Sequence, residues 1–115
     1  MELLNIYKIL KKHNISLLQA CTLQIIHGSQ TKTSDLAVSF GITSSAITHQ
    51  IDAMIRKRLI VRYHPRDERD DRRVILLGLT ELGARVLDEI LHEIDQASKS
   101  EESDKNTSAG NAIAS

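Results

Sequence analysis

The side chains best suited to binding a ligand lie on the segment 44–57, which combines hydroxyl, imidazole and guanidinium groups. Its apolar residues, led by Ile47 and Ile51, recur at helical spacing and therefore share one face of a predicted helix. The polar residues then project from the other face, where they can bond to base edges or to phosphates. The candidates are Ser44, Ser45, Thr48, His49 and Arg56, together with Thr33 at the start of the preceding predicted helix.

Alternatively, the same face is a solvated helix surface without a ligand, in which Arg56 pairs with Asp52 one turn earlier. The neighbouring segment favours ligand binding. Residues 56–73 hold eight basic and four acidic residues, a net charge of +4, although the whole chain is neutral. Such a local basic stripe suits a polyanion. The arginines of its charged loop are Arg66, Arg69, Arg72 and Arg73.

The sequence offers little support for an enzyme, because no nucleophile–base pairing, phosphate-binding loop or metal-ligand spacing is visible. We therefore predict no cofactor and no metal. Cys21 is either a redox sensor or a structural thiol, and its apolar neighbours favour the latter. No apolar run is long enough to span a bilayer and residue 1 leads straight into an amphipathic segment, so we expect a cytoplasmic, nucleoid-associated protein without a membrane partner.

Hydrophobic periodicity and capping residues predict the elements that position these side chains. Two short β-type segments flank the charged loop and form a hairpin, the shape of a wing. A small Ala37 and a turn at Gly41 allow the helices on either side of the turn to pack as a helix-turn-helix. The predicted helices cover 3–11, 17–26, 33–40, 44–57 and 81–96, and the predicted strands cover 59–63 and 74–79.

The fold class is therefore mainly α with a small β-hairpin wing (α+β), a winged helix-turn-helix. We predict a single domain over residues 1–97. Within it, residues 31–79 form the DNA-binding core and wing, and residues 1–30 and 80–97 supply the flanking helices. Residues 98–115 are polar and are expected to be a disordered tail.

The run 71–83, DRRVILLGLTELG, resembles the signature of MarR-type regulators, in which a D-R-R wing and a strand lead into L-T-x-x-G at the start of a helix. Segments 34–37 and 44–48 resemble the family's helix-turn-helix, and the likeness extends from about residue 14 to 87. The resemblance implies a homodimer on a pseudo-palindromic duplex site, with residues 1–30 and 80–97 as the dimerisation helices and Asp71 positioning an arginine. It also implies DNA contacts from Ser45, Thr48, His49, Arg72 and Arg73.

The chain departs from the family pattern at three places. His49 stands where the family usually has Arg or Lys, and Arg58 stands where it usually has Gly. Because a left-handed turn strains a residue with a Cβ atom, we predict a different turn at Arg58. The first helix is short and no helix is expected after the last, which leaves open whether a small-molecule effector binds.

Two classes of function follow. The first is a sequence-specific, duplex-DNA-binding transcription regulator, with repression as the expected mode, whose helix 44–57 enters the major groove and whose wing 64–73 meets the minor groove or backbone. The second is a winged-helix protein-interaction module without DNA binding. The salt dependence of duplex binding separates them.

Overall fold

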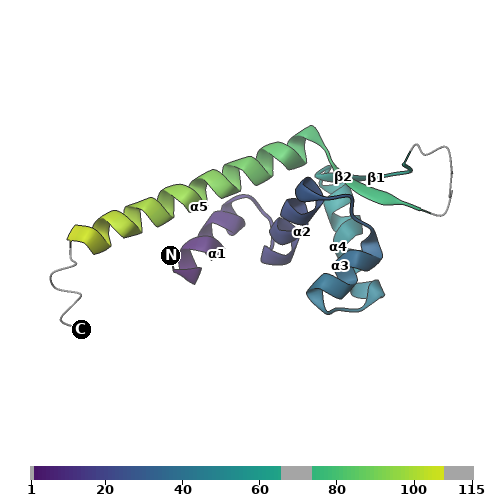
Figure 1. Cartoon of the computed structure of the whole chain (residues 1–115), viewed down its shortest axis with the longest axis horizontal. Helices are drawn as coiled ribbons and strands as arrows, with labels where there is room; N and C mark the ends of the chain where they lie inside the picture. Colours follow the sequence, from purple (N-terminus) through teal and green to yellow (C-terminus); the bar gives the residue numbers. More distant parts are fainter. Residues whose placement is uncertain (1, 66–73, 108–115) are drawn as a thin grey trace.

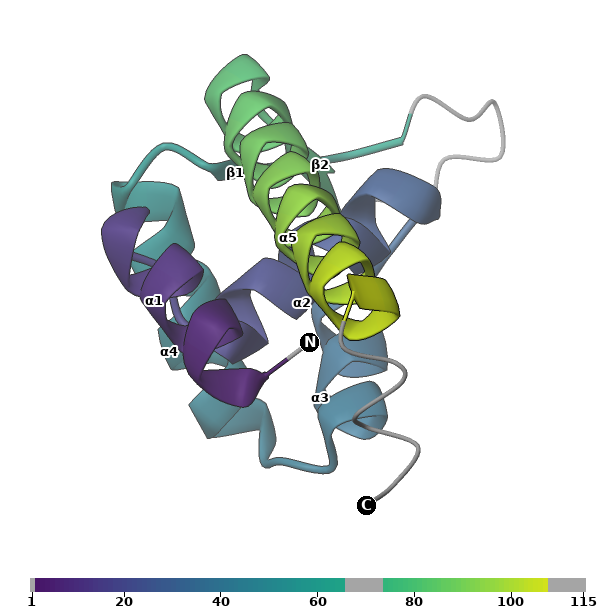
Figure 2. The ribbon, with the colours of Figure 1, turned by 90° about the vertical axis from the view of Figure 1, so that its left-hand side faces the viewer.

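A computed structural model of the chain describes residues 2–65 and 74–107, and it shows five helices and one two-stranded sheet in these ranges (Figure 1). The second, third and fourth helices and the sheet form a body. The last helix is a long arm that extends from this body, and the first helix packs on the arm. In Figure 2 the other helices lie grouped beside this arm, which is seen nearly end-on. The elements are α1 (Leu3–Lys12), α2 (Leu17–Gly28), α3 (Thr33–Phe40), α4 (Ser44–Arg56), β1 (Ile60–Tyr63), β2 (Leu76–Leu79) and α5 (Glu81–Thr107).

The winged helix-turn-helix architecture is confirmed, with a core that is almost entirely aliphatic. α3 packs against α4, and β1 and β2 form an antiparallel hairpin in which Ile60 pairs with Leu79 and Tyr63 with Leu76. The amide of Leu77 also donates to the carbonyl of Thr31 at 2.9 Å, which ties the hairpin to the chain before α3. Buried core residues include Leu10, Leu23, Leu36, Ile47, Ile51, Met54, Ile60, Leu77, Leu87 and Ile90.

Three helices end in the same type of turn, and the prediction of a different turn at Arg58 is wrong. Arg58 has φ 62°, and the amides of Arg58 and Leu59 donate to the carbonyls of Ile55 and Met54 at 2.9 and 3.0 Å. This is a Schellman ending, in which the buried Leu59 and Met54 lie at the two positions that usually meet. The hydrogen bonds to the last carbonyls of α4 and the burial of Leu59 and Met54 stabilise this turn by more than the strain at Arg58 costs. Gly41 (φ 65°) and Asn14 (φ 54°) end α3 and α1 similarly.

Replacing Arg58 by glycine should therefore stabilise the protein. A left-handed residue with a Cβ costs about 1–2 kcal/mol, of which the greater freedom of glycine in the unfolded chain cancels part. We expect a gain of about 0.5–1 kcal/mol in the free energy of unfolding, measured by urea denaturation. Arg58→Ala is the control, because it removes the guanidinium but keeps the Cβ. An equal gain in both variants would contradict the strain explanation.

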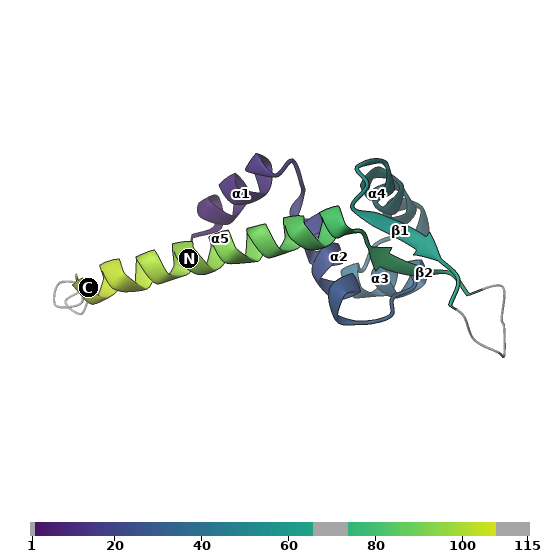
Figure 3. The same cartoon turned by 90° about the horizontal axis from the view of Figure 1, so that it is seen from above.

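The last helix is longer than predicted. α5 continues to Thr107, so residues 98–107 are helical, and the prediction of a disordered tail from residue 98 is wrong over this range. The segment holds Glu and Lys residues with high helix propensity, and Lys99 pairs with Asp95 one turn earlier at 3.1 Å. The remainder of the predicted tail, 108–115, lies outside the described residues. α5 extends past α1, away from the hairpin at the opposite end (Figure 3).

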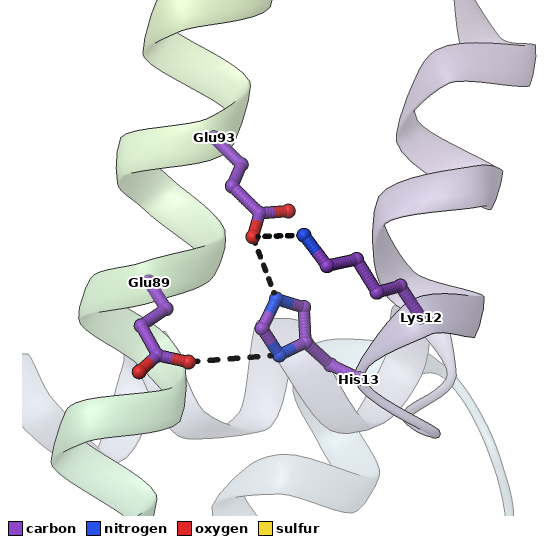
Figure 4. Close-up of polar contacts among 4 residues, drawn as sticks. All are labelled: Lys12, His13, Glu89 and Glu93. Carbon is purple, nitrogen blue, oxygen red and sulfur yellow. Dashed lines mark hydrogen bonds and ion pairs between the residues drawn. The ribbon is translucent and has the colours of Figure 1, made fainter.

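A polar cluster joins the end of α1 to α5 (Figure 4). Glu93 accepts hydrogen bonds from Lys12 at 3.0 Å and meets the His13 ring Nε2 at 3.1 Å, while His13 Nδ1 lies 3.8 Å from Glu89. The His13 side chain is only 12% exposed. The hydrogen bond from Lys12, more than that from His13, lowers the pKa of Glu93 below its ordinary value. This cluster fixes α1 on the arm.

Glu93→Gln should lower the thermal stability at pH 7 and have a smaller effect in acid. A carboxyl group whose pKa is lowered by folding stabilises the folded state above its unfolded pKa, and this contribution disappears as the pH falls through the folded pKa. Melting curves of both proteins at pH 7 and at about pH 3 measure the difference. A difference that persists unchanged at the lower pH would rule out the ionised cluster as its cause.

Candidate nucleic-acid interface

The helix α4 is held by a cap at its N-terminus and by the burial of one face. Its first turn begins at Thr43, whose side-chain oxygen accepts a hydrogen bond from the amide of Ala46 at 3.1 Å. Ile47, Ile51 and Met54 are fully buried against the rest of the body. Because one face is locked in the core, the orientation of the opposite face is determined by packing rather than by flexible side chains.

The opposite face of α4 carries a shallow hollow. Ser45, Thr48 and His49 are exposed and line it together with Ser44 and Asp52. The structure therefore brings four of the predicted site residues onto one surface. Arg56 is exposed at the last turn of α4 but does not line the hollow, and Thr33 is half-buried at the start of α3.

The sequence did not predict one charged pair on this surface. Nη2 of Arg62, on β1, donates to Oδ1 of Asp52 at 2.8 Å. This hydrogen bond is the main cause that lowers the pKa of Asp52, and the charges of Arg56 and His49 act in the same direction. Asp52 therefore pairs with Arg62, and the alternative pairing with Arg56 is not found. The two partners are ten residues apart and on different elements, so no periodicity in the sequence links them.

The base of the wing lies at the same end of the molecule as α3 and α4 (Figure 1). His64 Nδ1 contacts the carbonyl oxygen of Val74 at 3.2 Å, beyond the last paired residues of the hairpin. The four predicted wing arginines, Arg66, Arg69, Arg72 and Arg73, lie outside the described residues, as does Asp71. Their roles remain predictions.

The L-T-x-x-G run places the start of α5 against the end of α4. The Thr80 hydroxyl donates to the carbonyl of Arg58 at 2.6 Å, and its oxygen accepts from the amide of Gly83 at 2.9 Å. A Cβ atom at Gly83 would overlap the carbonyl oxygen of Leu59. The two residues of this run therefore have separate structural roles. Thr80 caps α5, and Gly83 permits the close approach of α5 to the turn after α4.

The described residues give no support to a redox role of Cys21 or to a metal site. Cys21 is half-buried on α2. Within residues 2–65 and 74–107, no three histidine, cysteine or acidic side chains are grouped so that they could hold a metal ion. In the same ranges, no helix is both long and apolar enough to cross a bilayer.

Comparison with known proteins agrees with the fold. The chain is 32% identical over 81 residues to YhbI of Bacillus subtilis strain 168, an uncharacterized HTH-type transcriptional regulator; the match covers 70% of this chain and 51% of that protein. The chain thus spans about half the length of this curated relative. No family model matches the sequence.

Solved structures extend the comparison over nearly the whole chain. YusO from Bacillus subtilis is 25% identical with a TM-score of 0.76, over 96% of this chain and 79% of that chain. MepR of S. aureus, in a complex with DNA, is 23% identical with a TM-score of 0.72, over 96% of this chain and 90% of that chain. The transcriptional regulator Tm0710 from Thermotoga maritima has a TM-score of 0.75 at 22% identity, over 96% of this chain and 76% of that chain.

The buried face of α4, the tight turn at Gly41 and the hairpin define a winged helix-turn-helix protein. The L-T-x-x-G start of α5 adds a more specific likeness. In this run and in its fold the chain resembles the MarR-type regulators. Two of the proteins that it resembles, YhbI and Tm0710, are transcriptional regulators.

Proposed function

We propose that this protein is a transcription regulator that binds duplex DNA sequence-specifically. In this proposal α4 enters the major groove and the wing reaches the adjacent minor groove or backbone. The observation that carries it is the division of α4 into a fully buried apolar face and an exposed face of short polar groups around the hollow. Such a helix presents fixed donors and acceptors at the scale of a base pair.

The likeness to MepR in a DNA complex supports the same proposal, since a fold of this shape holds DNA in that protein. The charge pattern also agrees, because the segment 56–73 is basic while residues 81–105 hold eight acids and three bases. Because phosphates repel acidic groups and attract basic ones, the acidic arm is suited to lie away from the DNA backbone. The basic segment is suited to approach it.

We further propose that the protein acts as a homodimer on a pseudo-palindromic site, with repression as its mode. Large apolar side chains on α1 and α5 are exposed in the single chain, among them Leu3 at 81%, Leu4, Tyr7 and Leu91. A second copy that covers them would bury this surface and place two recognition helices on one face of the duplex. Sedimentation at micromolar concentration should show a dimer, and a monomer throughout would contradict this part.

The DNA-binding proposal is tested by the affinity for a random-sequence duplex over a series of salt concentrations. Binding through several phosphates releases counterions, so the affinity should fall steeply and linearly on a double logarithmic scale. Fluorescence anisotropy of a labelled duplex measures it, with a neutral polymer of similar size as a control for nonspecific effects. No binding at low salt would reject the proposal in favour of a protein-interaction module.

A further inference from the structure

We infer that Asp52 and Arg62 form a specificity-determining pair, in which Arg62 holds the Asp52 carboxylate toward the hollow so that it accepts a hydrogen bond from the exocyclic amine of a base, with cytosine N4 as the best match. The inference rests on the proposed DNA-binding function. It adds a base-reading role for Asp52 and a positioning role for Arg62, which neither the sequence motif nor the relatives assign.

The position of Asp52 is the first argument. It lies three residues after His49, four after Thr48 and seven after Ser45, so it shares their side of α4. It is the one acidic side chain among the described residues that line the hollow. A carboxylate here would face the same groove as the hydroxyls beside it.

The chemistry of an ionised carboxylate is the second argument. Arg62, Arg56 and His49 keep the pKa of Asp52 below its usual range, so the group is charged at neutral pH and acts only as an acceptor. A negative charge near phosphates weakens binding to every sequence. It is useful only where it discriminates, since it can accept from the amine of cytosine but is repelled by the acceptors N7 and O6 of guanine.

The geometry of Arg62 is the third argument. Arg62 lies on β1, which packs against α4. Its Nη2 donates a hydrogen bond to Oδ1 of Asp52 at 2.8 Å. The side chains of Arg62 and Asp52 are 39% and 44% exposed, so the pair lies at the surface beside the hollow and not in the core. An exposed pair of this kind adds little to stability. Its effect is to fix the rotation of the carboxylate and to offset part of its charge.

The test compares base preferences of the full-length wild-type protein and Asp52→Asn. Preferred sites are first selected from a random duplex pool with the wild type, and affinities are then measured for every single-base variant of the selected site. Asparagine keeps the shape and the oxygen that Arg62 binds but replaces the second acceptor by a donor. We expect D52N to lose a cytosine preference of about tenfold at one position in each half-site.

Two further variants separate charge from base reading. Asp88→Asn removes one negative charge from an exposed position on α5 and should leave every base preference unchanged. Arg62→Ala should weaken the same cytosine preference as D52N and also lower the affinity for all sequences, because the carboxylate is left uncompensated. Thermal melts confirm that the variants remain folded.

The outcomes distinguish this inference from the proposed function. If the wild type selects a site and D52N retains every preference, the inference is overturned while the DNA-binding function stands. A uniform change of affinity in both D52N and R62A, with no change at any base, overturns it equally. If the wild type selects no sequence at all, sequence-specific binding itself fails and the inference falls with it.

Discussion

Gly83→Ala is expected to destabilise the protein by at least about 2 kcal/mol, although alanine is the better helix former by about 1 kcal/mol. The added Cβ would overlap the carbonyl oxygen of Leu59, which is backbone and cannot rotate away. That carbonyl also accepts from the amide of Thr80 at 3.1 Å, so any shift disturbs the bonds that join α5 to the end of α4. Chemical denaturation of wild type and variant measures the loss.

Gly28→Ala is the matched control. Gly28 also lies in a helix, but a Cβ there would have no heavy atom within 4 Å. Its replacement should be neutral or slightly stabilising. Similar losses in both variants would show that the effect comes from glycine in general and not from the close approach at Gly83.

Ile51→Ala is expected to cost about 3–4 kcal/mol, since the side chain is fully buried and its removal leaves a cavity beneath α4. Because Ile51 helps to lock the inner face of α4, the variant should also loosen the helix that carries the hollow. Urea denaturation gives the stability, and hydrogen exchange of the α4 amides reports the local loosening.

Val38→Ala provides the comparison for Ile51→Ala. Val38 is on α3 and 82% exposed, so its truncation should change the stability by less than about 0.5 kcal/mol. A loss below about 1 kcal/mol for Ile51→Ala would contradict the assignment of Ile51 to the core.

Much of this fold is predictable because its signals are local. The bounds 33–40 of α3, the turn at Gly41 and the cap at Thr80 follow from residues next to the elements that they limit. The buried and exposed faces of α4 follow from one periodicity. The four hydroxyl and imidazole candidates therefore lie together on its outer face, and their binding role stays a prediction.

The rest depends on contacts that no local pattern encodes. Asp52 meets Arg62 across two elements, and His13 meets Glu93 across 80 positions of sequence. At Arg58 a propensity rule predicted a different turn, but the buried Leu59 and the Schellman bonds determined it. The extension of α5 was missed because low hydrophobicity was taken as a sign of disorder, whereas helix propensity and pairing between turns sustain the helix.

The proposed function requires that the outer face of α4 reads base sequence. Its most direct test is the ratio of affinities for a selected site and for random duplex, measured for wild type and for Ser45→Ala combined with His49→Ala. The matched control combines Gln24→Ala with His27→Ala, two exposed positions on α2. We predict that the α4 variant lowers this ratio by about a hundredfold, as the loss of two base contacts requires, and that the α2 variant does not change it. An unchanged ratio in the folded α4 variant would contradict the claim.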